Sequence, residues 1–246
     1  MPDKLTVINA VKAALEKEPR INLHKYPIQI DYDPEDEVLT LEGEVSDIAA
    51  KKLGLELAAA VPGVRGIVDR LHVEPSVRMG DGAILDAVRD ALLQEPGLQH
   101  CTIKVHRVHH NGKVEIVREA LFPNPGMIEI SVNDGVVLLD GHVLSLIQKR
   151  LAGVLAWWVP GSRDVINGLA VEPPEEDSDD QITEAVRLVL EKDPFVNADS
   201  IQVSTKQAVV TLDGIVINEV QRNMAEYDAW YVFGVDKVVN NLKARE

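Results

Sequence analysis

The chain has 246 residues, of which 46% are hydrophobic and 26% charged, and its formal net charge is −15. This charge disfavours partners with anionic backbones, so we expect no nucleic-acid binding, and no apolar run reaches the roughly 18 residues that a membrane-spanning helix needs. The single cysteine, Cys101, excludes an internal disulfide, and the first residues show no signal-peptide pattern. We therefore expect a cytoplasmic location, with the periplasm as the alternative.

One pattern occurs three times along the chain. Its anchors are three glycines, Gly43, Gly141 and Gly214. A leucine stands two residues before each anchor, a valine two residues after it, and another leucine 28 residues after it. Because three copies keep these spacings without a gap, we interpret them as an internal repeat.

In chain order, each copy is predicted to form a helix, two strands, a second helix and a last strand. The first helix ends at an acid–proline pair, because proline lacks the amide donor that a helix needs. The strands alternate apolar and polar residues, which is typical of a half-buried sheet. We expect the first helices at 5–17, 84–94 and 182–191, and the last strands at 67–73, 165–171 and 235–242.

The second helix of each copy follows the anchor glycine. The residues that follow the anchor glycine by 6, 10, 13 and 17 positions lie on one side of such a helix. We expect this side to face the core. In the third copy these residues are Val220, Met224, Tyr227 and Tyr231. In the second copy they are Ile147, Leu151, Val154 and Trp158, and in the first Ala49, Leu53, Glu56 and Ala60.

Two stretches carry a family resemblance, Gly135-Val-Val-Leu-Leu-Asp-Gly-His-Val143 and Gly234-Val-Asp-Lys-Val-Val-Asn-Asn-Leu242. With the preceding helix and its acid–proline stop, they resemble the BON domain of bacterial osmotic-shock and envelope proteins. The resemblance covers nearly the whole chain. It implies an α+β fold of three tandem αββαβ units, each a mixed three-stranded sheet with two helices on one face. It also implies a phospholipid or envelope ligand and no catalytic site. Most family members carry an export signal, a pattern that the first residues here do not show.

Two linkers divide the chain into three predicted domains, 1–76, 77–174 and 175–246. The third domain has 7 basic and 15 acidic residues, and the other two are also net negative. The second linker, 172–180, is proline-led and strongly acidic, so we expect it to be extended and solvated. This organisation predicts a string of small domains rather than one fused core.

The second copy is longer than the others. Between its acid–proline pair and its first predicted strand, apolar residues alternate on both sides of Asn111-Gly112. Such a pattern predicts an inserted β-hairpin, at about 101–127.

Histidines gather in this insertion. His106, His109 and His110, close to Cys101, could bind a transition metal, because imidazole and thiolate are ligands for zinc and copper. The alternative is a polar face and turn on an exposed hairpin. We favour that alternative because the spacing matches no standard ligand pattern, and we expect no cofactor.

Aromatic residues are scarce but occupy equivalent positions. Trp157 and Trp230 both lie 16 residues after their anchors, where the first copy has Ala59. We expect these two rings at the edge of the buried face, where a tryptophan can contact a membrane interface or a protein partner. The alternative, which we favour, is packing against a neighbouring copy or a helix end.

No phosphate-binding loop, nucleophile elbow or metalloprotease motif occurs in the sequence. The sequence therefore predicts a non-catalytic binding protein, and the resemblance indicates phospholipid or an envelope component as its partner, in osmotic or general stress. One alternative is a protein–protein interaction scaffold. Another is a cytoplasmic sensor of an ion such as potassium. The oligomeric state is left open.

Overall fold

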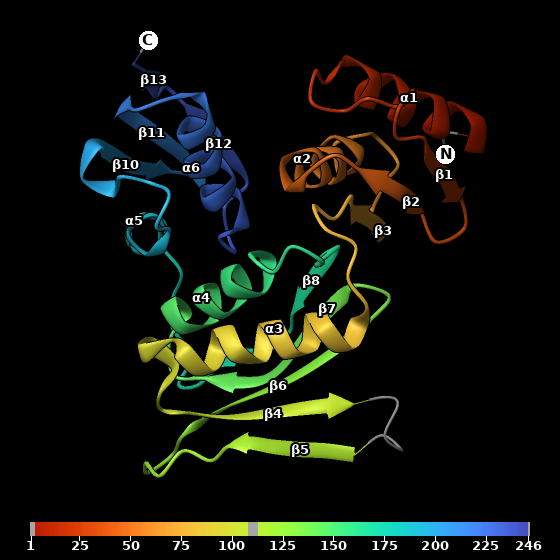
Figure 1. Ribbon diagram of the computed structural model, residues 1–246. Helices are drawn as coiled ribbons and strands as arrows, with labels where there is room; N and C mark the ends of the chain where they lie inside the picture. The colour runs from red at the N-terminus through yellow and green to blue at the C-terminus, as the bar shows by residue number, and fades with distance from the viewer. Residues whose placement is uncertain (1–2, 108–112, 246) are drawn as a thin grey trace. The chain divides into compact units, whose positions relative to one another are not determined.

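The computed structural model describes residues 3–107 and 113–245. The chain divides into two compact units, Met1–Glu74 and Pro75–Glu246. The first unit holds the first copy of the repeat, and the second holds the other two (Figure 1). The expected α+β architecture of repeating units with mixed sheets is confirmed.

The first unit is a small sheet with two helices. Its elements are α1 (Lys4–Lys17), β1 (Ile28–Asp33), β2 (Val38–Val45), α2 (Ile48–Ala59) and β3 (Gly66–Val73). Strand β2 is central, antiparallel to β1 and parallel to β3. The inner side chains of α1, Val7, Val11 and Leu15, pack with Leu39 and Leu41 of β2 into one core.

The middle copy has a wider sheet, in the order β5-β4-β6-β7-β8, with β9 also paired to β7. Helices α3 and α4 cover one face of it, and β5 forms its outer edge (Figure 1). The elements are α3 (Asp81–Gln94), the 3-10 turn η1 (Pro96–Leu98), β4 (Cys101–Arg107), β5 (Lys113–Arg118), β6 (Gly126–Asn133), β7 (Val136–Val143), α4 (Leu146–Trp157), β8 (Asp164–Asn167) and β9 (Ala170–Val171).

The third copy repeats the plan of the first. Strand β11 is antiparallel to β10 and parallel to β12 and β13. The elements are α5 (Asp179–Lys192), the 3-10 turn η2 (Ala198–Ser200), β10 (Ile201–Lys206), β11 (Val209–Val216), α6 (Glu219–Tyr231), β12 (Lys237–Asn240) and β13 (Lys243–Ala244).

The helices of the second and third copies pack together. Helix α4 contacts α3 and β7 of its own copy and also α5 and α6 of the third. The two copies therefore form one compact unit, where the sequence predicted separate small domains. The boundaries after residues 76 and 174 stay predictions.

The predicted inner face of the second helix is wrong by about one position in the third copy. Val220 is 66% exposed and Tyr227 is 37% exposed, whereas Ala225 and Ala229 are fully buried. In the first copy the predicted Ala49 is buried, but so are Ala50, Gly54 and Ala58, which lie one position further along the helix. Small side chains face the sheet because they let the helix lie close to it. A prediction based on the largest apolar residues therefore places the buried face about one position away from where it lies.

The anchor glycines lie inside strands rather than at the turn into the helix. Gly141 has φ +112°, and a Cβ there would lie 2.2 Å from the carbonyl oxygen of Met127 on β6. At Gly214 a Cβ would lie 2.1 Å from the carbonyl oxygen of Ser200. The glycines recur because the neighbouring backbone leaves no room for a side chain.

An aspartate in the first turn of the first helix holds the hairpin turn in two copies. Asp81 accepts hydrogen bonds from the amides of Asp134 and Gly135, at 3.0 and 2.9 Å. Asp179 accepts from the amides of Gln207 and Ala208, at 2.7 and 2.9 Å. These bonds lower the pKa of Asp179, because they stabilise its charged form.

Candidate binding surfaces

The two tryptophans lie on the packed helices, where Trp157 is half-buried and Trp230 is buried. The ring of Trp157 stacks on Tyr231, with centroids 5.6 Å apart and an interplanar angle of 19°. Trp230 is 1% exposed. Trp157 thus packs against the neighbouring copy, as in the alternative that the sequence favoured. A ligand role for either ring stays a prediction.

Trp158 joins the same two copies through a buried carboxyl group. Its Nε1 donates to Oδ1 of Asp228, at 2.9 Å. Asp228 is 3% exposed, and its Oδ2 has no hydrogen-bond partner among the described residues. Burial and the nearby charge of Asp193 raise the pKa of Asp228 to about 8, although the Trp158 donor acts in the opposite direction. Asp228 is therefore protonated in the folded protein at neutral pH.

Arg150 makes the second polar link between the copies. Its side chain is fully buried, and its Nη2 donates to both carboxylate oxygens of Asp177, at 2.6 and 2.7 Å. Its Nε donates to the carbonyl oxygen of Phe233, at 2.9 Å. The equivalent residues are Lys52 and Asn223, so this contact belongs to the middle copy. Sequence reasoning missed it, and the available signal was an arginine between apolar residues of a helix.

The residues of the acidic linker are exposed from 172 to 178, in agreement with the expected solvation, and two of its acids also contact the folded protein. Besides Asp177, Glu175 accepts a hydrogen bond from the amide of Leu146 at the start of α4, at 2.8 Å. Beyond the linker, the Nζ atom of Lys192 lies 2.9 Å from a carboxylate oxygen of Glu95. Asp177 thus pairs with an arginine, and Glu175 binds the N-terminus of a helix. Both surroundings stabilise a negative charge.

The insertion forms two strands that widen the middle sheet. Strand β4 pairs with β5 antiparallel and with β6 parallel. Its inner residues Cys101, Ile103 and Val105 are fully buried in the core of the copy. Burial raises the pKa of the Cys101 thiol, although Arg118 acts in the opposite direction. The cysteine is therefore a core residue and not a reactive thiolate.

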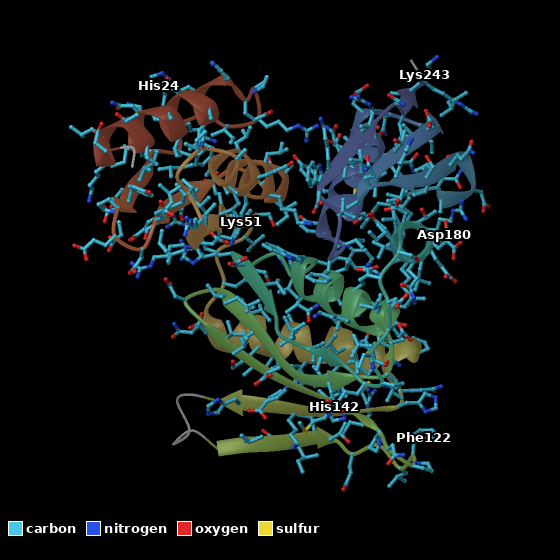
Figure 2. All side chains as sticks on the ribbon, turned by 180° about the vertical axis from the view of Figure 1, so that it is seen from behind. His24, Lys51, Phe122, His142, Asp180 and Lys243 are labelled. Carbon is cyan, nitrogen blue, oxygen red and sulfur yellow. The ribbon has the colours of Figure 1, made fainter. Side chains whose placement is uncertain are left out.

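Only one histidine of the predicted metal site lies among the residues that the structure describes. His106 lies on β4, while His109 and His110 lie outside the described residues. The ring of His100 stands 3.9 Å from that of Phe122, on the loop after β5, and His142 lies on β7 (Figure 2). Among the described residues, no group of three or more metal-binding side chains occurs. The metal site stays a prediction, which a zinc titration followed at the histidine rings tests.

Each copy presents one exposed aliphatic residue at the same place on its open sheet face. The residue 25 positions after each anchor is 40% exposed as Val68, 52% as Ile166 and 36% as Val239. In the middle copy Leu138 on β7 lies beside Ile166 and is 38% exposed. The equivalent residues on β2 and β11 are threonines, Thr40 and Thr211. The open face is thus most apolar in the middle copy.

Repeated αββαβ units on mixed sheets define a class of small tandem α+β domains. The chain belongs to the BON-domain family, whose model matches residues 3–75, 113–173 and 178–246. The second match begins at β5 and leaves α3 and β4 outside it.

Among known proteins, the chain is similar to osmotically-inducible protein Y of Escherichia coli strain K12. The two are 32% identical over 124 residues, which make up 48% of this chain and 62% of that protein. The matched part thus spans less than two thirds of that relative.

Solved structures similar to the chain include the C-terminal domain of CdsD, a structural protein of the type III secretion system of Chlamydia trachomatis. That domain is 14% identical, with both chains fully covered and a TM-score of 0.25. A second CdsD structure is 14% identical and has a TM-score of 0.24, with 97% of this chain and 92% of that chain covered. Scores this low carry no argument about function.

Within the described residues, no helix is both long and apolar enough to cross a bilayer.

Proposed function

We propose that the chain is a non-catalytic binding protein of the osmotic-stress response, and that its open sheet faces contact a phospholipid surface. The observation that carries the proposal is the exposed aliphatic residue at one place in every copy, Val68, Ile166 and Val239. In the middle copy Ile166 lies beside the exposed Leu138, and adjacent exposed apolar side chains offer a surface that an apolar partner can cover. The name of the Escherichia coli relative supports the osmotic setting.

The charge of the chain restricts the kind of lipid. At a net charge of −15, simple attraction to anionic headgroups is unfavourable, so the contact is apolar and neutral lipid suffices. We do not assign the lipid contact to the packed helices, since Trp157 and Trp158 contact other residues of the second unit. We therefore assign the lipid contact to the sheet faces rather than to Trp157 and Trp230.

Vesicle co-sedimentation tests this proposal. The protein is mixed with neutral phosphatidylcholine vesicles and with vesicles that contain anionic phosphatidylglycerol. We expect binding to both, and at least a tenfold loss when Val68, Ile166 and Val239 are all changed to serine. The control changes to serine three aliphatic residues elsewhere that are even more exposed, namely Leu5, Ile217 and Val220. If the unmodified protein stays in the supernatant with every lipid, the membrane proposal is wrong.

The second candidate function is a scaffold that binds other proteins. One observation favours it: the second unit already joins two BON copies through Arg150 and Trp158, so helix faces of this family can recognise each other. A lack of vesicle binding would leave this function as the leading one. The cytoplasmic location stays a prediction under either function.

A further inference from the structure

Helix α4 carries an apolar stripe that the neighbouring copy covers. Leu151 and Val154 on this stripe are 3% and 0% exposed. Among the described residues, the core of the middle copy does not include Val154, and helices α5 and α6 of the third copy both contact α4. From α5, Leu188 packs against the middle core, and the Nζ of Lys192 lies 2.9 Å from a carboxylate oxygen of Glu95. The first helix of one copy thus covers the second helix of another.

Helix α6 repeats this stripe, but much of the stripe is exposed. At the places of Leu151 and Val154 it has Met224 and Tyr227, and one turn earlier it has Val220. Val220 is 66% exposed and Tyr227 is 37% exposed, while Met224 is half-buried. An apolar pattern that is buried on α4 therefore lies on the surface of the third copy.

Two further apolar side chains extend this surface at the start of α6. The side-chain amide of Gln221 donates to the carbonyl oxygen of Phe195 at 2.9 Å and accepts from the amide of Ile217 at 3.1 Å. Phe195 is 69% exposed and Ile217 is 63% exposed. Gln148 makes the same two bonds in the middle copy, where Gly97 takes the place of Phe195. We call the exposed set the α6 surface: Phe195, Ile217, Val220, Met224 and Tyr227.

This surface is not a general feature of the repeat. In the first copy the same places hold mostly small or polar residues, namely Arg20, Ser46, Ala49, Leu53 and Glu56. A contiguous apolar surface that only one copy exposes indicates an interaction site.

The way in which the middle copy is covered indicates which helix fits the α6 surface. Helix α5 uses Leu188 and Lys192, which stand six and two residues before its proline. In α1 these places hold Ala13 and Lys17, and both are exposed. Helix α3 has Asp90 at the first place, and a carboxylate there is unfavourable against an apolar surface. Because α5 is already packed on α4, α1 is the first helix that fits.

The third copy also lacks the buried charge of the middle copy. Arg150 of α4 is fully buried and pairs with Asp177, in the linker before α5. Its place on α6 is taken by Asn223, which is exposed. A helix that covers α6 therefore leaves no arginine unpaired, and it needs no acid of its own at this place.

We propose that α1 of a second copy of this chain docks on the α6 surface, as α5 docks on α4 within the chain. Leu188 packs against the core that contains Leu151, so their counterparts Ala13 and Met224 meet in this contact. The small side chain of Ala13 lets the two helices lie close together. The contact joins different surfaces of two molecules, so association continues beyond a dimer unless a ring closes.

Cross-linking tests which helices meet. The single variants Ala13→Cys and Met224→Cys are mixed and joined with a short bismaleimide, and the native Cys101 contributes little background because it is fully buried. We expect a cross-linked dimer in the mixture and little in either variant alone. The control replaces Met224→Cys with Leu138→Cys, an exposed position on the middle sheet. A mixture that forms no more dimer than this control, or a Met224→Cys protein that forms as much dimer by itself, overturns the proposal.

Sedimentation velocity over a concentration series tests the association itself. We expect the unmodified chain to self-associate, and more strongly with added salt, because molecules with a net charge of −15 repel each other. Val220→Lys and Ala13→Gln, both at exposed positions, should each weaken association at least tenfold, and Ile116→Lys, at a 55% exposed residue of β5, should leave it unchanged. A chain that stays monomeric at every concentration, or equal effects of Val220→Lys and Ile116→Lys, overturns the proposal. Because neither measurement contains lipid, failure here is distinguishable from failure of vesicle binding.

Discussion

Two single residues, Asp228 and Arg150, make buried polar contacts between the second and third copies. At neutral pH the carboxyl group of Asp228 is protonated in the folded protein, whereas it is ionised in the unfolded chain. Its pKa of about 8 lies above the ordinary 3.8, so the folded protein keeps a proton that the unfolded chain releases between these values. Protonated Asp228 therefore contributes to the free energy of unfolding in full below about pH 4. As pH rises, this contribution falls by up to ~1.4 kcal/mol per pH unit, and it is lost above about pH 8.

The variant Asp228→Asn removes this titration while its amide oxygen still accepts from Trp158. We expect it to be at least ~1 kcal/mol more stable than the unmodified protein at pH 9, and to lack the slope between pH 4 and 8. Urea unfolding at a series of pH values measures this. The control Asp199→Asn, at an exposed aspartate, should keep the slope. An Asp228→Asn protein with an unchanged slope would contradict the assignment.

Arg150 should be costly to remove. Replacement by methionine fills the space but leaves the carbonyl of Phe233 without its donor and Asp177 without its partner. We expect a loss of about 2–3 kcal/mol in the free energy of unfolding of residues 75–246, somewhat below the usual value for a buried pair because Asp177 is partly exposed. Arg150→Lys should lose less, since it keeps the charge but not the two-sided contact. A loss below ~1 kcal/mol for Arg150→Met would show that the contact is dispensable.

At the scale of elements, the first helix of the second and third copies is fastened to the hairpin turn of its copy. Asp179→Ala removes two acceptors, so the amides of Gln207 and Ala208 should exchange with solvent at least tenfold faster. Because the folded pKa of Asp179 is lowered, this protection should be present above pH 3.8 and be lost as pH falls through the folded pKa. Hydrogen exchange followed by NMR measures it. Asp180→Ala, at the next and exposed residue, should leave both amides protected.

The elements themselves follow from the sequence, because strand alternation and acid–proline stops act locally. Which face of a helix is buried does not follow from the sequence in this way. In α6 the residues against the sheet are alanines, and hydrophobicity cannot separate them from the exposed Val220. The partners of Arg150 and Trp158 could not be predicted from the sequence either, since they lie 27 and 70 residues away in the chain. Trp157 and Trp158 contact the neighbouring copy, through Tyr231 and Asp228, and neither partner can be read from the sequence.

At the scale of the whole molecule, the two compact units should unfold separately. The three tryptophans of the chain, Trp157, Trp158 and Trp230, all belong to the unit Pro75–Glu246. Tryptophan fluorescence therefore reports that unit alone, whereas far-UV circular dichroism reports both. We expect one urea transition by fluorescence and two by circular dichroism, and the transition seen by dichroism alone belongs to residues 1–74.

Cleavage at engineered protease sites checks this division. A cut between residues 74 and 75 should leave the fluorescence transition in place, because the described contacts of α4 with α5 and α6 stay within one fragment. A cut in the linker between residues 174 and 175 should lower its midpoint, since Asp177 and Glu175 then reach Arg150 and Leu146 without a covalent tether. Equal midpoints after both cuts would mean that the second and third copies are as independent as the linkers alone suggested.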